Sequence, residues 1–183
     1  MIIKTSFDKQ TSLPFRCNLL RVFLISCILT FTGCQQTPNK ETIKPVLDTD
    51  KFTATLAKCI DGDTARFIVD GKEEKVRFLA IDTPEITGET PEPYGEEASD
   101  YTCSVLKRAT KIVLELDPNS DMRDKYDRLL AWIWVDGDLL NQQLIKRGYA
   151  EIAFLYGDYL YIKELDDTEA IAERSKIGIW SQK

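Results

Sequence analysis

An Asp-Gly pair at residues 70–71 constrains the fold of this chain more than any other feature. It separates two short alternating runs, residues 64–69 and 75–81, and Asp-Gly between such runs is the strongest short-range signal for a β-hairpin. Paired residues of a hairpin count outward from its turn, so Asp63 and Asp82, which flank the two runs, are expected side by side at its open end. The sequence therefore predicts that two carboxylates meet at one edge of a sheet.

Two further charged residues are expected near these carboxylates. Glu85 follows Asp82 after a Thr-Pro pair, which turns the chain out of the sheet because proline has no N–H for a strand ladder. Arg77 lies within the returning strand. Three acids around one arginine are unfavourable in a core, but they suit a cation and an anionic substrate. The alternative is a set of solvated acids that follow strands, as many turn residues do.

Composition excludes several classes of function. The chain has no histidine, which removes His-containing triads, His-ligated zinc and His general bases. Acid–base chemistry must then use carboxylates, Lys, Tyr, Cys or bound water. A net charge of −6 over 183 residues argues weakly against non-specific binding to nucleic acid or anionic membranes. This length is typical of one domain.

The N-terminal part of the chain is expected to be a targeting signal rather than a folded unit. Arg16 and Arg21 bracket the start of an apolar run at residues 19–31, which is short for a membrane span. The run leads into Thr32-Gly33-Cys34, which resembles a bacterial lipoprotein signal in which Cys34 becomes the lipidated N-terminus. An uncleaved anchor helix is the alternative. The predicted parts are a signal peptide, a flexible tether and a globular domain, at residues 1–33, 34–50 and 51–183.

Both interpretations of the N-terminus predict an exported domain that is anchored to the cell envelope. In bacterial lipoproteins a Gln after the cysteine, here Gln35, usually directs the protein to an outer membrane where one exists. An oxidising compartment permits a disulfide between Cys59 and Cys103. The sequence gives no distance between these cysteines, which are expected on a strand and a helix. Two buried free thiols are the simpler interpretation.

Hydrophobic periodicity predicts an α+β domain with five strands and three helices. The strands are expected at residues 52–60, 64–69, 75–81, 112–116 and 129–135. The helices are expected at residues 96–111, 140–147 and 160–176, with polar loops at 86–93 and 117–128. Five short strands with an interposed helix, followed by more helices, fit a small barrel of the oligonucleotide-binding (OB) type.

Ordered motifs along the domain resemble the staphylococcal nuclease (thermonuclease) family. They are Ile60-Asp61-Gly62-Asp63-Thr64, Arg77-Phe78-Leu79, Asp82-Thr83-Pro84-Glu85, Tyr94-Gly95-Glu96-Glu97-Ala98, Asp124-Lys125-Tyr126-Asp127-Arg128, Asn141, Gly148-Tyr149-Ala150 and Ile179-Trp180. The set covers essentially all of residues 51–183. The resemblance implies a five-stranded OB-fold barrel capped by three helices. It also implies Ca²⁺-dependent phosphodiesterase activity that cuts DNA and RNA to leave 3′-phosphates.

The resemblance assigns roles to the acids of the hairpin. Asp63 and Asp82 match calcium carboxylates and Thr83 matches a carbonyl ligand, a set of hard oxygen donors that Ca²⁺ prefers. Glu85 matches the general base that activates the attacking water, a role that a carboxylate can fill in a chain without histidine. The alternative for Glu85 is a surface acid of a loop.

The resemblance also implies an anion-binding set. Arg77 and Arg128 match the two arginines that hold the scissile phosphate, which a guanidinium can bind through two parallel hydrogen bonds. Arg77 could instead pair with a nearby carboxylate, and both can hold at once. Lys125 and Tyr126 match residues that contact the terminal phosphate of the bound nucleotide. Asp127 stands where the family has a glycine, which is tolerable if that position has a positive φ.

Two aromatic residues near the end of the barrel complete the expected site. Phe154 stands where the family often has a tyrosine that stacks on a base, and Tyr156 is expected on the same face. Packing at the barrel edge is the alternative for both. For the whole protein, the alternatives to a nuclease are an inactive barrel that binds single-stranded nucleic acid and a structural envelope lipoprotein. No protein partner is implied.

Overall fold

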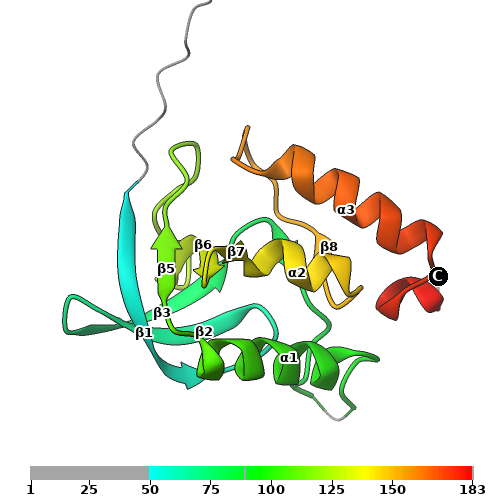
Figure 1. Cartoon of the computed structure of the whole chain (residues 1–183), viewed down its shortest axis with the longest axis horizontal. Helices are drawn as coiled ribbons and strands as arrows, with labels where there is room; N and C mark the ends of the chain where they lie inside the picture. Colours follow the sequence, from blue (N-terminus) through cyan, green and yellow to red (C-terminus); the bar gives the residue numbers. More distant parts are fainter. Residues whose placement is uncertain (1–49, 89, 183) are drawn as a thin grey trace, which may run out of the picture. The chain divides into compact units, whose positions relative to one another are not determined.

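The computed structural model describes residues 50–88 and 90–182 (Figure 1). The predicted signal peptide, the lipidation site at Cys34 and the tether up to residue 49 lie outside the described residues. In the part of the chain that the structure describes, no helix combines the length and apolarity that a membrane crossing requires.

A sheet of six strands closes into a barrel. Its strand order is β3-β2-β1-β5-β6-β7, and an additional parallel pairing of β3 with β6 closes the ring of five strands. These strands are β1 (Lys51–Cys59), β2 (Thr64–Val69), β3 (Lys72–Phe78), β5 (Ile112–Glu115), β6 (Leu129–Val135) and the short β7 (Asp138–Leu139). The prediction of an α+β fold with a five-stranded OB-type barrel is confirmed.

The predicted hairpin is also confirmed, with one correction at its end. Val69 pairs with Lys72 across a turn in which Asp70 and Gly71 have φ values of 50° and 79°, as a two-residue hairpin turn requires. The returning strand ends at Phe78, so the expected extension to residue 81 is wrong. Ala80 has a φ of 60°, and this left-handed residue takes the chain out of the barrel.

After this turn the chain enters a second, two-stranded sheet. It consists of β4 (Ile81–Asp82) and β8 (Glu151–Ile152), in which Asp82 pairs with Glu151. The turn is fixed from both sides, because Leu79 donates its N–H to Ala131 and accepts a hydrogen bond from Asn141. Asp82 therefore stands on a short strand of its own rather than at the end of the hairpin strand.

Within the described residues, one α-helix lies between β4 and β5, and two further α-helices and a short 3₁₀-helix come after β7 (Figure 1). They are α1 (Gly95–Arg108), α2 (Leu140–Lys146), α3 (Ile162–Arg174) and η1 (Gly178–Ser181). The first helix ends three residues before its expected end at Lys111, because the N–H groups of Thr110 and Lys111 donate to the Asp136 carboxylate. The third begins at Ile162 rather than Leu160, because Tyr161 before it has a φ of 60°.

The α2 helix connects the core to the end of the barrel that carries the acids. Its Leu140, Asn141, Leu144 and Ile145 are all buried, and burying a large apolar side chain contributes roughly 1.5–3 kcal/mol. Asn141 accepts a hydrogen bond from the N–H of Ile133 in β6 and donates to the carbonyl of Leu79. The helix thereby fixes the turn that precedes Asp82.

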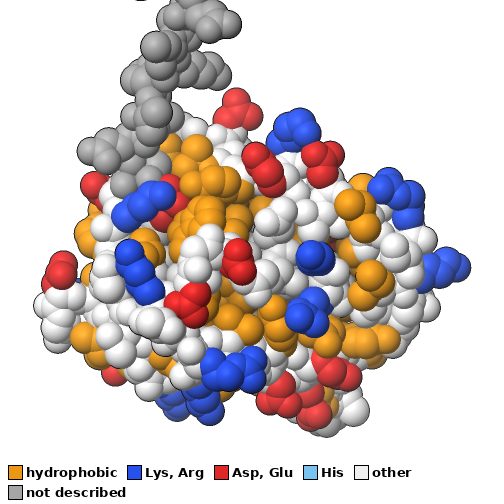
Figure 2. Space-filling model, in the orientation of Figure 1, with side chains coloured by type: hydrophobic (Ala, Val, Ile, Leu, Met, Phe, Trp, Pro, Cys, Tyr) orange, Lys and Arg blue, Asp and Glu red, His pale blue; other side chains and the backbone are white. Residues whose placement is uncertain are grey.

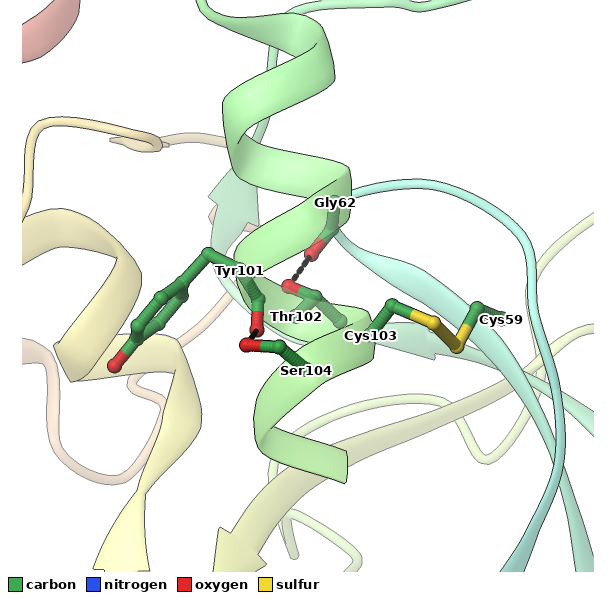
Figure 3. Close-up of a disulfide and its surroundings, with 6 residues drawn as sticks. All are labelled: Cys59, Gly62, Tyr101, Thr102, Cys103 and Ser104. Carbon is green, nitrogen blue, oxygen red and sulfur yellow. Dashed lines mark hydrogen bonds between the residues drawn. A yellow bond between two sulfur atoms is a disulfide. The ribbon is translucent and has the colours of Figure 1, made fainter. Parts of the chain in front are cut away.

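Cys59 and Cys103 form a disulfide (Figure 3). The expectation of two free thiols is therefore wrong. The last residue of β1 and the middle of α1 come together, with a Cα–Cα distance of 5.6 Å that is usual for a disulfide. The sequence separation of 44 residues corresponds, in the chain-entropy model, to a stabilisation of about 4 kcal/mol. Only the tertiary packing of α1 against β1 could reveal this proximity.

Candidate active site

Arg77 joins the two carboxylates of the hairpin. Its Nη1 lies 2.8 Å from Asp63 Oδ2, and its Nη2 donates to Asp82 Oδ1 at 2.8 Å. The Arg77 side chain is only 10% exposed. The two acids and the arginine therefore lie together, as predicted. The contacts also match the alternative that Arg77 pairs with a nearby carboxylate.

Asp63 is held by a dense set of donors. Its Oδ2 accepts hydrogen bonds from the N–H and the hydroxyl of Thr83, at 2.9 and 3.0 Å. Its Oδ1 accepts from the Thr64 hydroxyl at 3.1 Å, and its own carbonyl accepts from the N–H of Phe78. These contacts fix the side chain in one orientation and join β2 to the segment that follows β4.

Asp61 is a third acid of this group, and the sequence analysis gave it no role. Its carboxylate accepts a hydrogen bond from the N–H of Asp63 at 3.1 Å. Burial, together with the negative charge of Asp63, raises the pKa of Asp61 to about 6. The signal was available, since an Asp that bonds to the N–H two residues later forms a common Asx-turn.

Asp82 lies partly exposed among further negative charges. Its side chain is 42% exposed. Burial raises the pKa of Asp82, and Arg77 offsets part of that rise. The nearby carboxylates of Asp63 and Glu85 raise the pKa further. Asp61, Asp63 and Asp82 therefore place more negative charge in this region than Arg77 balances.

Glu85 occupies an exposed loop between β4 and α1. A reciprocal pair of hydrogen bonds supports it, in which the Glu85 N–H donates to the Glu92 carboxylate and the Glu92 N–H donates to the Glu85 carbonyl. The Thr87 hydroxyl also donates to Glu85 Oε2 at 3.3 Å. Glu92 was absent from the sequence-based site, and its contribution depends on the fold of this loop.

The donor chemistry of these residues fits Ca²⁺. The carboxylates of Asp63 and Asp82 are hard oxygen ligands, and a divalent cation would offset the negative charge that, after burial, contributes to the raised pKa values of Asp61 and Asp82. Within residues 50–88 and 90–182, no three His, Cys, Asp or Glu side chains form a group that could hold a metal ion. The predicted site, with two carboxylates and the Thr83 carbonyl, is smaller than such a group, and calcium binding remains a prediction.

Arg128 is oriented by its own loop. Asp124 Oδ2 accepts from Arg128 Nε at 2.6 Å, while Asp124 Oδ1 accepts from the N–H groups of Tyr126 and Arg128. Burial alone would raise the pKa of Asp124, but the hydrogen bonds from Arg128 and Tyr126 hold it below its usual value. Asp127 has a φ of 60°, so a residue other than glycine is accommodated in the left-handed conformation that the sequence analysis considered.

Both arginines belong to the region where β3 and β6 pair. Arg77 is the partner of Leu130 in the parallel β3–β6 pair, and Arg128 is two residues before Leu130. Arg128 precedes the first residue of β6 and follows Asp127, which has a φ of 60°. The alternation of side chains along a strand therefore does not assign its face. The register places the two arginines near the same end of the β3–β6 pair.

Aromatic rings accompany both arginines. The Phe154 ring lies 5.5 Å from the Arg77 guanidinium carbon, and the Tyr126 ring lies 5.0 Å from Lys125 Nζ and 5.4 Å from the Arg128 guanidinium carbon. These distances are in the range of cation–π contacts. Both rings are largely exposed, so they leave a surface on which a base could stack.

Tyr156 differs from this arrangement. Its side chain is 83% exposed, so packing at the barrel edge does not describe it. The strand argument for placing it on the face of Phe154 fails, because β8 ends at Ile152 and Phe154 has a φ of 58°, so the shared face stays a prediction. Without a continuous strand, the two-residue alternation of side chains does not apply.

Comparison with known families identifies the family of this chain. The family described as staphylococcal nuclease homologue matches residues 75–182. This chain belongs to the staphylococcal nuclease family. The family match takes in most of the predicted site residues, namely Arg77, Asp82, Thr83, Glu85, Lys125, Tyr126, Arg128, Phe154 and Tyr156, whereas Asp63 precedes it.

Relatives in this family include two proteins of Bacillus subtilis (strain 168). The chain is 41% identical over 131 residues to endonuclease YncB, covering 70% of this chain and 61% of that protein. It is 40% identical over 131 residues to SPbeta prophage-derived endonuclease YokF, covering 70% of this chain and 44% of that protein. The matches thus span less than two thirds of either relative.

A third relative is covered more fully. The chain is 37% identical over 131 residues to the thermonuclease of Staphylococcus hyicus, covering 70% of this chain and 76% of that protein. These relatives are similar to the staphylococcal nuclease domain described here.

Proposed function

We propose that this protein is a Ca²⁺-dependent nuclease that hydrolyses DNA or RNA and leaves 3′-phosphate products. The single observation that carries the proposal is the position of Arg77. It lies between the carboxylates of Asp63 and Asp82 and against the ring of Phe154. A phosphate-binding group, cation-binding oxygens and a base-stacking surface thus lie together. The relatives' names, endonuclease and thermonuclease, support the same activity.

In this proposal Asp63, Asp82 and the carbonyl of Thr83 hold Ca²⁺, which supplies positive charge close to the phosphate. Arg77 and Arg128 bind the non-bridging oxygens of the scissile phosphate. Negative charge accumulates on these oxygens as the nucleophile attacks, so both arginines stabilise the transition state more than the ground state.

Glu85 takes a proton from the attacking water. The water oxygen forms a bond to phosphorus, and the bond from phosphorus to the 5′-oxygen of the next nucleotide breaks. The departing oxygen receives a proton from solvent, which leaves a 3′-phosphate and a 5′-hydroxyl. Lys125 and Tyr126 bind the terminal phosphate of the substrate, and Phe154 and Tyr156 supply aromatic surface for a base.

The proposal also includes the location of the protein. Residues 1–33 are a signal peptide, Cys34 carries the lipid, and residues 34–50 tether the nuclease domain (residues 51–183) to the cell envelope, at an outer membrane where one exists. This part rests on the sequence. The disulfide between Cys59 and Cys103 supports it, because structural disulfides persist in oxidising compartments outside the cytoplasm.

Digestion of plasmid DNA and of RNA in the presence of Ca²⁺, or of a chelator, tests the proposal. We expect cleavage with Ca²⁺, no cleavage with the chelator, and poor replacement by Mg²⁺, which demands near-ideal octahedral geometry. End-group analysis should find 3′-phosphates. Full activity with Mg²⁺ and a calcium-selective chelator would contradict the calcium assignment. Binding of nucleic acid without cleavage would indicate the inactive barrel. The absence of both binding and cleavage would indicate a structural lipoprotein.

A further inference from the structure

The turn that carries Asp61 and Asp63 is held against α1 by contacts that nuclease chemistry does not require. Cys59, the last residue of β1, is bonded to Cys103 of α1. One residue earlier on the helix, the Thr102 hydroxyl donates to the carbonyl of Gly62 at 2.6 Å (Figure 3). The helix is therefore attached to both ends of the segment between Cys59 and Asp63.

Packing at Gly62 leaves this turn no room to shift. A Cβ atom added to Gly62 would come within 2.7 Å of the Thr83 hydroxyl and 2.9 Å of the Ala98 Cβ. Gly62 is thus enclosed between α1, through Ala98, and the residue that follows β4. Thr83 on the far side donates two hydrogen bonds to Asp63. The helix and Thr83 thus pack on the same glycine, and Thr83 orients the Asp63 carboxylate.

The barrel holds the two ends of the turn. The regular β1–β2 pairing ends at Cys59, which is level with Ala65. Past that point, the N–H groups of Ile60 and Asp61 share the carbonyl of Thr64, at 3.3 and 3.2 Å, and the carbonyl of Asp63 accepts from a β3 residue. The middle of the turn, at Gly62, is instead held by its attachment to α1.

We propose that the Cys59–Cys103 disulfide positions the Asp61–Asp63 turn for cation binding. The inference rests on the proposed function, in which Asp63 binds Ca²⁺. The disulfide fixes α1 four residues before Asp63, and α1 in turn holds Gly62 and faces Thr83. Loss of an outer contact that orients a metal ligand commonly lowers metal affinity 10- to 100-fold, and we expect about tenfold here because the Thr102 bond remains.

Calorimetric titration of the full chain with Ca²⁺ tests the inference. The Cys59→Ser/Cys103→Ser double variant should bind Ca²⁺ about tenfold more weakly than the wild-type chain under non-reducing conditions. Leu114→Ala is the matched control, because it destabilises a buried site of β5 while the disulfide remains. The control should keep wild-type affinity, which separates positioning of the turn from a general loss of stability.

Amide hydrogen exchange in the Ca²⁺-free protein gives a readout that does not depend on metal binding. The amides of Gly62 and Asp63 should exchange faster in the double variant than in Leu114→Ala. If the double variant does not fold, Thr102→Val replaces it, because it keeps the disulfide but removes the hydrogen bond to the Gly62 carbonyl. It should also weaken Ca²⁺ binding and speed amide exchange at Gly62 and Asp63. Equal affinity and equal exchange in these variants would overturn the inference. If the titration detects no Ca²⁺ binding to the wild-type chain, the proposed function is overturned, and with it the proposed role of the disulfide.

Discussion

Two groups of carboxylates, one at the candidate site and one at the end of β5, differ in how they are neutralised. The site acids are Asp61, Asp63 and Asp82, which have Arg77 as their shared cation. The second group, called the β5 acids, consists of Glu115 at the end of β5 and Asp117 two residues later. These residues are 1% and 5% exposed. Both groups are buried or partly buried, where an uncompensated charge is costly.

Donors from several elements surround the β5 acids. Glu115 accepts hydrogen bonds from Trp134 Nε1 at 2.6 Å and from the Tyr161 hydroxyl, and it pairs with Lys51 at 3.2 Å. Asp117 accepts from Trp132 Nε1 at 2.9 Å and from the N–H groups of Asn119 and Leu160. Burial and Glu115 together raise the pKa of Tyr161, so it remains a neutral donor.

The difference indicates separate roles. The β5 acids link β6 to the segment that precedes α3. The Tyr161 ring packs edge-on against both tryptophans at 5.4 Å. Among the site acids, by contrast, burial and mutual repulsion raise the pKa values of Asp61 and Asp82. We infer that the β5 acids serve stability and that the site acids retain excess charge for a cation.

The largest effect should follow a change beside the site acids. Glu85→Gln should lower the rate of DNA cleavage by about two orders of magnitude or more, the usual scale of general-base catalysis, with little change in Ca²⁺ affinity or melting temperature. Single-turnover cleavage assays measure the effect. Glu96→Gln, which alters an exposed acid in the first turn of α1, is the control. Unchanged turnover in Glu85→Gln would remove Glu85 from the mechanism.

A change among the β5 acids should have the opposite profile. Glu115→Gln should lower the free energy of unfolding by about 2–3 kcal/mol, because buried hydrogen bonds to a charged acceptor are lost. Urea denaturation measures this loss, and the folded variant should keep its Ca²⁺ affinity. A loss below about 0.5 kcal/mol, the range of ordinary surface changes, would contradict the structural role.

The smallest effect concerns salt. Residues 51–183 carry 18 Lys and Arg against 26 Asp and Glu, and no basic residue lies between Arg77 and Lys107. Arg77 and Arg128 already pair with carboxylates. On the face that Figure 2 shows, basic side chains are scattered among acidic and apolar ones. Two or three phosphate contacts predict a slope of about −2 to −3 for log affinity against log salt concentration.

Binding of the Glu85→Gln variant to DNA across a salt series at fixed Ca²⁺ measures this slope. A slope steeper than about −5 would reveal a basic track and contradict the charge argument. A shallow slope would sharpen the comparison, because affinity would then depend mainly on the cation and the paired arginines.

Sequence alone could predict the features that depend on local signals. The Asp70–Gly71 turn fixes the pairing of β2 with β3 whatever surrounds it, so the approach of Asp63 and Arg77 could be expected. Ordered motifs then pointed to the barrel and to Arg128. Asp124, four residues before Arg128, carried a usable signal because acid–base pairs at this spacing commonly interact.

Features that depend on long-range packing could not be predicted. The pairing of β4 with β8 brings together residues about 70 positions apart in the chain, and two-residue strands have no period to detect. The Cys59–Cys103 disulfide depends on the approach of α1 to β1. The contact of Phe154 with Arg77 depends on a left-handed residue after a strand has ended.

Direct titration with Ca²⁺ in the absence of nucleic acid tests the central claim, that the site acids bind a cation and the β5 acids do not. The wild-type chain and Glu115→Gln should bind Ca²⁺ with equal affinity. In Asp63→Asn, the loss of Ca²⁺ affinity should be the main effect. At a hundredfold excess over its dissociation constant, Ca²⁺ should also raise the free energy of unfolding of the wild-type chain by about 2.7 kcal/mol. Absence of binding to the wild-type chain, or undiminished binding to Asp63→Asn, would contradict the account.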